Sequence, residues 1–225
     1  MEESKNKIIV ALDNLSSQSA LEIAASLSGL VWGFKITDLL FESTNIISQL
    51  KKFGHVFADA KLHDIPKTVE NEVKKLSALG ADLITVHAAG GYEMMLAAKS
   101  AAEQSQIVAV TVLTSLDEIT TENIFNKNIK DIVLDFAKEA QRASLDGIVC
   151  SGQELLYLKD FYKLKKVVPG IRPDWFSESS DQKRIITPHE ALNLGADFLV
   201  IGRPILNYND PVEAVRKILA EIDSF

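Results

Sequence analysis

The chain has 225 residues, of which 47% are hydrophobic and 24% are charged, and its formal net charge at pH 7 is −7. This composition is ordinary for a globular protein and excludes a disordered one, while the length allows either one or two domains. The acidic balance opposes binding to a nucleic acid such as DNA, which requires clustered Lys and Arg.

The N-terminal segment Met1–Lys7 is polar and runs directly into an apolar stretch, without the pattern of a signal peptide. No apolar run approaches the length that spans a bilayer, so no membrane association is expected. The single cysteine, Cys150, lies in an apolar run and is expected to be a packing residue rather than a nucleophile. Because it has no internal disulfide partner, a reducing cytoplasm is the expected location.

Short runs rich in Val and Ile alternate with longer helical patterns along the whole chain, which is typical of a parallel sheet with crossover helices. About eight strands are predicted, the number that closes a (β/α)8 TIM barrel. No linker or low-complexity tract divides the sequence, so we predict one barrel domain over residues 1–225. The predicted strands are Ile8–Asp13, Val31–Ile36, Val56–Leu62, Leu83–His87, Ile107–Leu113, Gly147–Cys150, Lys166–Ile171 and Phe198–Gly202.

The first two predicted strands each carry a charged residue near the C-terminal end. Asp13 closes the first strand, and Lys35 shares a strand face with Val31 and Gly33. The active site of a (β/α)8 barrel lies at the C-terminal ends of its strands, so both side chains are candidates for that site.

The third predicted strand carries the most informative pattern in the sequence. Its apolar face holds Val56, Ala58, Ala60 and Leu62, whereas its other face holds Phe57, Asp59 and Lys61. Asp64 follows where Pro66 stops the strand and opens a helix. Because buried charges are costly unless paired, this cluster indicates a functional site. The alternative is a solvated edge strand followed by an ordinary Asp N-cap at Asp64.

The helix predicted next, Thr68–Leu79, has an apolar stripe formed by Val69, Val73 and Leu76 and ends at Gly80. The tetrapeptide Leu-Gly-Ala-Asp follows it and recurs at Leu194–Asp197, before the eighth strand. We interpret this repeat as shared loop chemistry between helix and strand, with no regular repeat period.

Two further polar residues fall at the ends of the fourth and fifth strands, His87 and Thr114. His87 is followed by small residues, and a hydrogen-bonded histidine at the barrel rim is as good an interpretation as a proton carrier. The four histidines lack close metal-ligand spacing, and lysines among the carboxylates oppose a cation, so no metal site is predicted.

The seventh and eighth strands end in two similar corners, Gly170 with Arg172 and Gly202 with Arg203. Backbone N–H groups at glycines and a bidentate Arg bind phosphate well, and these are the loops that bind it in many (β/α)8 barrels. A phosphate site is therefore favoured over the alternative of plain turns with solvated arginines. The segment Pro173–Gln182, which follows the seventh strand, is the least regular in the chain.

The chain resembles the orotidine 5'-phosphate decarboxylase family along nearly its whole length. The matching stretches include Ala11–Asp13, Phe34–Lys35, Asp59–Pro66, Val86–Ala88, Val112–Thr114, Pro169–Pro173, Asp181–Gln182 with Thr187–Pro188, and Ile201–Ile205. The Asp-x-Lys-x-x-Asp core is shared across a superfamily, but its extension through His63, Ile65, Pro66 and Thr68 is more specific.

This resemblance implies decarboxylation of orotidine 5'-phosphate to UMP without a cofactor, in pyrimidine biosynthesis. It implies a catalytic charge array of Lys35, Asp59, Lys61 and Asp64, with Asp59 against the substrate carboxylate and Lys61 protonating C6. Asp64, Ile65 and Thr68 are expected to reach in from the other subunit of a homodimer. The implied substrate contacts are Asp13 and Lys35 to the ribose, Thr114 to the pyrimidine, and Gln182, Gly202 and Arg203 to the phosphate, with Arg172 nearby.

Two other functions remain in view. A Mg-dependent sugar-phosphate decarboxylase or aldolase of the same superfamily requires an acidic ligand near the position of Lys35, and the lysine argues against it. A catalytically silent phosphate-binding barrel would retain Gly202 and Arg203 without needing Lys61. One departure from the resemblance lies in residues 174–180, where glycines are expected and the sequence reads Asp-Trp-Phe-Ser-Glu-Ser-Ser.

Overall fold

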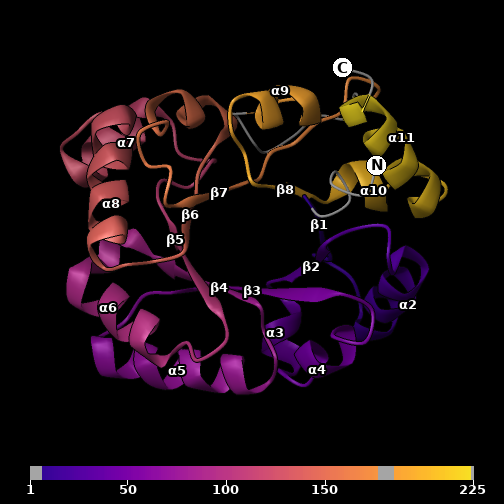
Figure 1. The fold of residues 1–225 in the computed structure, drawn as a ribbon, viewed down its shortest axis with the longest axis horizontal. Helices are drawn as coiled ribbons and strands as arrows, with labels where there is room; N and C mark the ends of the chain where they lie inside the picture. The colour runs from indigo at the N-terminus through magenta and orange to yellow at the C-terminus, as the bar shows by residue number, and fades with distance from the viewer. Residues whose placement is uncertain (1–6, 177–184, 224–225) are drawn as a thin grey trace.

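The computed structural model describes residues 7–176 and 185–223, and its eight parallel strands close into a barrel in sequence order. Each strand pairs with its two neighbours, and β1 pairs with β8 to complete the ring (Figure 1). The predicted (β/α)8 architecture is thereby confirmed. The strands are β1 Ile8–Ala11, β2 Gly33–Ile36, β3 His55–Leu62, β4 Leu83–His87, β5 Gln106–Val110, β6 Gly147–Val149, β7 Lys165–Val168 and β8 Phe198–Ile201.

Helices surround the barrel and bury the outward faces of its strands (Figure 1). Outward-facing strand residues such as Ile8, Val10 and Phe34 are fully buried in one large apolar cluster with helix residues. The α-helices are α2 Ser17–Leu27, α3 Leu39–Glu42, α4 Ile46–Leu50, α5 Pro66–Ala78, α6 Gly91–Ala101, α7 Glu118–Phe125, α8 Ile129–Arg142, α9 Pro188–Asn193, α10 Arg203–Leu206 and α11 Pro211–Asp223, and the 3-10 helices are η1 Ala88–Gly90 and η2 Gly152–Tyr157. Within the described residues, no helix is both long and apolar enough to cross a membrane.

A second, smaller apolar cluster fills the barrel interior. It includes Ile9, Phe57, Leu83, Val108 and Val167 from five of the strands, and Trp32 packs against it. Inward and outward residues alternate along β1 and β3 as the period of two requires. This layer closes the barrel below the charged residues of β2 and β3, so it forms the floor on which the site rests.

Three aspartates, which immediately precede β4, β6 and β8, form hydrogen bonds to the preceding strands β3, β5 and β7. The carboxylates of Asp82, Asp146 and Asp197 accept the backbone N–H groups of Val56, Ile107 and Lys166 at 2.7, 2.8 and 2.8 Å. The backbone N–H groups of the three aspartates donate in turn to the carbonyls of the same three residues. The repeated Leu-Gly-Ala-Asp sequence therefore has a structural role at the N-terminal end of the barrel.

All eight predicted strands are present, but several end earlier than predicted. β1 ends at Ala11 instead of Asp13, β5 at Val110 instead of Leu113, and β7 at Val168 instead of Ile171. After β7 the ladder stops because Pro169 has no N–H donor and Gly170 has a left-handed φ of 77°. The chain beyond the shortened strands is thereby released to line the mouth of the barrel.

Helix α5 begins at Pro66, two residues before the predicted start, with proline in the first turn as its chemistry favours. Its N-cap is Ile65, which makes no side-chain capping bond. Asp64 instead accepts the N–H of Ile65 at 2.6 Å. The interpretation of Asp64 as an ordinary N-cap is therefore wrong, although the apolar stripe of Val69, Val73 and Leu76 is buried as predicted.

Candidate active site

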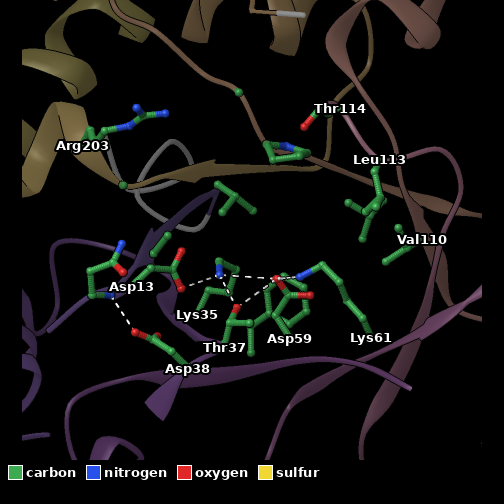
Figure 2. A pocket seen from close by; sticks show the side chains of 18 of the residues that line it. Asp13, Lys35, Thr37, Asp38, Asp59, Lys61, Val110, Leu113, Thr114 and Arg203 are labelled. Atoms are coloured by element: carbon green, nitrogen blue, oxygen red, sulfur yellow. Dashed lines mark hydrogen bonds and ion pairs between the residues drawn. The ribbon is translucent and has the colours of Figure 1, made fainter. Parts of the chain in front are cut away.

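A cavity of about 580 Å³ opens at the C-terminal ends of the strands, and most of the predicted site residues line it (Figure 2). Its polar wall is a row of four charged residues from β1, β2 and β3 or their ends, which we call the charge row. Val110 of β5 and Val149 of β6, together with Val112 beyond the end of β5, form part of the remaining wall. The charge row consists of Asp13, Lys35, Asp59 and Lys61.

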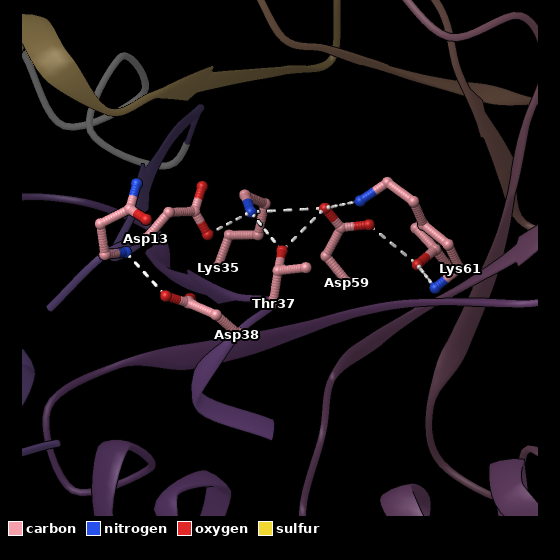
Figure 3. Close-up of polar contacts among 8 residues, drawn as sticks. Asp13, Lys35, Thr37, Asp38, Asp59 and Lys61 are labelled. Carbon is pink, nitrogen blue, oxygen red and sulfur yellow. Dashed lines mark hydrogen bonds and ion pairs between the residues drawn. The ribbon is translucent and has the colours of Figure 1, made fainter. Parts of the chain in front are cut away.

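Lys35 lies in the middle of the charge row, and only 7% of the residue is exposed. Its ammonium donates to Asp13 Oδ1 at 2.8 Å and lies 3.3 Å from Asp59 Oδ2 (Figure 3). Burial alone lowers the pKa of Lys35, but the carboxylates of Asp59 and Asp13 outweigh it and raise the pKa above its ordinary value. Lys35 is therefore a permanent cation in the wall of the cavity.

Asp59 lies between the two lysines of the charge row. Its Oδ2 accepts from Lys61 Nζ at 2.6 Å, and its Oδ1 accepts from the hydroxyl of Thr85 at 2.9 Å. Burial favours the neutral acid, but the charges of Lys35 and Lys61 prevail and hold the pKa of Asp59 below its ordinary value. This ionised carboxylate at the cavity wall excludes the solvated edge strand as an interpretation of β3.

Lys61 has an unusual backbone conformation that directs its side chain. Its φ is +46°, in the left-handed region that non-glycine residues rarely adopt, and the pairing of β3 with β4 shifts register between Ala58 and Leu62. The N–H of Lys61, which this irregularity turns away from the ladder, donates to Thr85 Oγ1 at 2.8 Å. Such irregularities commonly re-aim a side chain beside an active site, and here the ammonium meets Asp59 at the cavity.

Two threonines complete this network and were not predicted. Thr85, fully buried on β4, links the Lys61 backbone to Asp59. Thr37, just past β2, accepts from Lys35 Nζ at 2.7 Å and donates to Asp59 Oδ2 at 3.3 Å. A signal for Thr85 exists in the sequence, because it is a polar residue on the same strand face as Leu83, which points into the barrel.

The cavity also contains the two Gly/Arg corners that were predicted to bind phosphate. Arg172, Gly202 and Arg203 all line it, with Gly170 beside Arg172. Arg172 is 9% exposed, donates from Nη1 to the carbonyl of Ile171 at 2.8 Å, and lies over the ring of Phe176. Figure 2 shows Arg203 across the cavity from Lys35 and Asp59, so a ligand with a remote anionic group could contact both walls.

The structure thus brings together eight of the predicted residues and leaves three out of the cavity of this chain. The three are Asp64, Ile65 and Thr68, at the start of α5, and Ile65 is 66% exposed. Gln182 lies outside the described residues, as does most of the Pro173–Gln182 segment. The eight that line the cavity are Asp13, Lys35, Asp59, Lys61, Thr114, Arg172, Gly202 and Arg203.

Two other residues considered from the sequence, His87 and Cys150, lie near the cavity or in its wall. His87 lies beside His63, with ring centroids 5.5 Å apart, and does not line the cavity. Burial is the main cause that lowers the pKa of His87 below its ordinary value, and the proximity of His63 and of the Lys61 ammonium acts in the same direction, so the neutral form of His87 is favoured. Cys150 is buried as predicted, and it also lines the cavity.

Comparison with known proteins identifies the family to which this chain belongs. Residues 6–218 match the model of the orotidine 5'-phosphate decarboxylase / HUMPS family. The chain belongs to this family. A relative named orotidine 5'-phosphate decarboxylase from Maridesulfovibrio salexigens is 39% identical over 97% of this chain and 100% of its own. A relative of the same name from Syntrophomonas wolfei is 40% identical over 98% of this chain and 99% of its own.

Solved structures of family members show the same architecture. The crystal structure of orotidine 5'-phosphate decarboxylase from Lactobacillus acidophilus superposes with a TM-score of 0.81 at 31% identity, covering 96% of this chain and 99% of that one. The enzyme of the same name from Pyrococcus horikoshii has a TM-score of 0.78 at 27% identity, over 96% of this chain and 98% of that one. The family model spans more than one activity, so the site itself must decide among them.

The charge row contains a cation of its own between two carboxylates. Within residues 7–176 and 185–223, no group of three or more His, Cys, Asp or Glu side chains is arranged to hold one. Asp13 and Asp59 both face the cavity, but the ammonium of Lys35 lies between them and is bonded to Asp13. The space between these two carboxylates is thus occupied by an ammonium group of this chain.

Proposed function

We propose that the chain decarboxylates orotidine 5'-phosphate to UMP and CO₂, a step of de novo pyrimidine biosynthesis, without metal or cofactor. The observation that carries this proposal is the charge row, in which a carboxylate with lowered pKa stands between two ammonium groups at the wall of the cavity. The relatives named orotidine 5'-phosphate decarboxylase, near 40% identity over almost the whole chain, support the same activity.

In the proposed reaction, Lys61 provides the proton that replaces the lost carboxylate. The bond from C6 to the carboxylate carbon breaks, CO₂ leaves, and the electron pair stays on C6. The Lys61 ammonium then donates a proton to C6 and recovers one from solvent. No carbonyl adjoins C6 to delocalise the pair, so an ammonium fixed by Asp59 at 2.6 Å stabilises charge where it develops. Asp59 lies against the substrate carboxylate, and the repulsion between the two negative charges favours departure of CO₂.

The rest of the cavity holds the nucleotide in place. Asp13 and Lys35 bind the ribose hydroxyls, and Thr114 binds the pyrimidine. Gly202, Arg203 and Gln182 bind the phosphate, with Arg172 nearby. The position of the Arg203 corner, across the cavity from the charge row, supports this division (Figure 2). Binding energy from the phosphate, remote from C6, is then available to assemble the site for reaction.

The active unit is proposed to be a homodimer in which each subunit completes the other's cavity. Asp64 of the partner subunit adds a third carboxylate beside Asp13 and Asp59, and Ile65 and Thr68 of the partner subunit contact the nucleotide. The exposure of Asp64 and Ile65 supports this, because both lie outside the cavity of their own chain. An apolar side chain that is 66% exposed, such as Ile65, suits a contact between subunits.

We also propose that residues 1–225 form one domain and that the protein works in the cytoplasm. The closure of all eight strands into one ring supports the first statement. The single cysteine, which is free and buried, supports the second.

The proposed activity is tested by following the ultraviolet absorbance of orotidine 5'-phosphate with the wild-type protein and with Lys61→Ala. We expect turnover by the wild type in the presence of EDTA and near-complete loss in the variant. Absence of wild-type turnover, or equal turnover by both, contradicts the proposal. Activity on a sugar phosphate that EDTA abolishes identifies the metal-dependent alternative, and nucleotide binding without any turnover identifies a silent barrel.

A further inference from the structure

Thr37 lies against the charge row, and the proposed reaction assigns it no role. It follows β2 by one residue and lies on the same side of the chain as Lys35, so its hydroxyl faces the cavity. Figure 3 shows it below and between the Lys35 ammonium and the Asp59 carboxylate. Thr37 itself bears no charge, yet it contacts the two central ions of the row.

The direction of both hydrogen bonds at Thr37 is fixed by its neighbours. An ammonium group can only donate and an ionised carboxylate can only accept. The hydroxyl oxygen therefore accepts from Lys35 Nζ at 2.7 Å, and its single proton is directed to Asp59 Oδ2 at 3.3 Å. A side chain that is both acceptor and donor is required here, and Val, which has the same shape, provides neither.

The contact with Thr37 also completes the coordination of the Lys35 ammonium. The three N–H donors of Lys35 have three acceptors within reach, at 2.8 Å on Asp13, 2.7 Å on Thr37 and 3.3 Å on Asp59. The contact with Thr37 is the shortest of the three and the only uncharged one. Without it, Lys35 keeps two flexible ion pairs, and its separation from Asp59 is no longer fixed.

We propose that Thr37 is a positioning residue that holds Lys35 and Asp59 at a fixed separation and thereby sets the turnover rate. This inference rests on the proposed decarboxylase activity. Asp59 must meet the substrate carboxylate while also orienting Lys61, so a small displacement of Asp59 affects both groups. Catalytic geometry is sensitive to displacements of this size. Thr37 acts through its neighbours and has no assigned contact with the substrate.

The test compares Thr37→Val and Thr37→Ser with the wild type. Loss of a hydrogen bond to a charged group corresponds to a decrease of roughly 10- to 100-fold, which we expect in kcat for Thr37→Val. The affinity for UMP, which lacks the carboxylate, changes less than about threefold, well below that range. Thr37→Ser restores kcat because it retains the hydroxyl. Thr121→Val is the matched control, since Thr121 is fully buried in α7 and its hydroxyl donates to the carbonyl of Asp117, away from the cavity.

A second measurement keeps the inference testable independently of turnover. In protein labelled with ¹⁵N-lysine, the Lys35 ammonium signal is identified by its absence from Lys35→Arg. We expect the signal in the wild type and in Thr37→Ser, and its broadening by solvent exchange in Thr37→Val. Wild-type kcat with an unchanged signal in Thr37→Val overturns the inference, as does equal impairment of the Val and Ser variants. An inactive wild type overturns the proposed function instead, and the ammonium signal then decides the role of Thr37.

Discussion

Lys61 Nζ and Asp59 Oδ2 lie 2.6 Å apart, although the two residues are separated by only one position on β3. On a regular strand, the side chains of residues i and i+2 lie on the same face and are roughly parallel, so their ends do not converge. The left-handed backbone of Lys61 turns its side chain toward Asp59 instead. The central contact of the site therefore depends on an irregularity of the strand, which Thr85 holds in place.

Thr85→Val should impair both stability and turnover. The substitution removes the acceptor of the Lys61 N–H and the donor to Asp59, and leaves a backbone donor unsatisfied. We expect the free energy of unfolding to fall by about 1–3 kcal/mol and kcat to fall at least tenfold. Urea unfolding and the absorbance assay measure the two effects. Thr111→Val is the matched control, because the carbonyl of Val149 that accepts its hydroxyl also accepts a backbone N–H. Equal effects of the two substitutions would refute the role of Thr85.

Asp82→Asn should reduce stability in a manner that depends on pH. Burial favours the neutral acid, but Lys51, His55 and the N–H of Val56 prevail and lower the pKa of Asp82 from 3.8. A carboxyl whose pKa is lower in the folded state stabilises the protein above its unfolded pKa, and the stabilisation disappears as pH falls through the folded value. The wild type should therefore exceed the variant in unfolding free energy at pH 7, and the difference should shrink below about pH 3.8.

The measurement for Asp82 is urea unfolding of both proteins between pH 7 and pH 3. Asp135→Asn is the control, because Asp135 forms ion pairs with Lys127 and Lys138 on the exposed surface, where such pairs contribute little. A difference between wild type and Asp82→Asn that stays constant over this range would show that the charge of Asp82 is not what stabilises β3.

Mixed dimers should recover activity that neither parent has. Under the proposed shared site, Lys61→Ala lacks the proton donor and Asp64→Asn lacks the carboxylate offered to the neighbouring subunit, so each homodimer should have two defective cavities. A heterodimer has one cavity with both defects and one with neither. We expect up to half of the wild-type activity per heterodimer after co-expression with two affinity tags and purification of doubly tagged protein. Doubly tagged dimers without activity would contradict a shared site.

Arg203→Ala should weaken the use of the phosphorylated substrate specifically. We expect kcat/KM for orotidine 5'-phosphate to fall roughly 10- to 100-fold, because a hydrogen-bonded charge pair with the phosphate is lost. With orotidine, which lacks the phosphate, the variant and the wild type should be equally slow. Arg142→Ala is the control, since Arg142 pairs with Glu139 on the surface of α8. A loss of equal size on both substrates would place Arg203 outside the phosphate site.

The barrel could be predicted from sequence because its signal is repeated eight times. Each short apolar run is followed by a helical pattern, so an error in one strand boundary does not change the architecture. The ends of the strands were less predictable, as β5 and β7 show, because apolar residues continue past the last ladder bond. Residues such as Val112 pack against the outer helices or line the cavity without belonging to a strand.

The charged residues of the site could be predicted, but the groups that orient them could not. Asp59 and Lys61 stand out because charges are rare in buried strands. Thr37 does not stand out, because threonine is a common strand residue and only its contacts with Lys35 and Asp59 reveal its role. Thr85 is recognisable as a polar residue on the inward face of β4, but its two partners on β3 are not. The irregularity at Lys61 was also missed, since lysine has no preference for a left-handed backbone. The roles of Asp64, Ile65 and Thr68 remain predictions, because they require a second subunit.

The left-handed conformation of Lys61 implies a conflict between what the fold prefers and what the reaction needs. Glycine is the residue that adopts a φ of +46° without cost, so a sequence optimised only for durability would place glycine at residue 61. Such a protein would have an unstrained backbone at this position but would lack the group that we propose as the proton donor. A strained lysine at residue 61 therefore lowers the stability of the fold in return for its proposed catalytic role. Conflicts of this kind between stability and activity are common when active sites are engineered for stability.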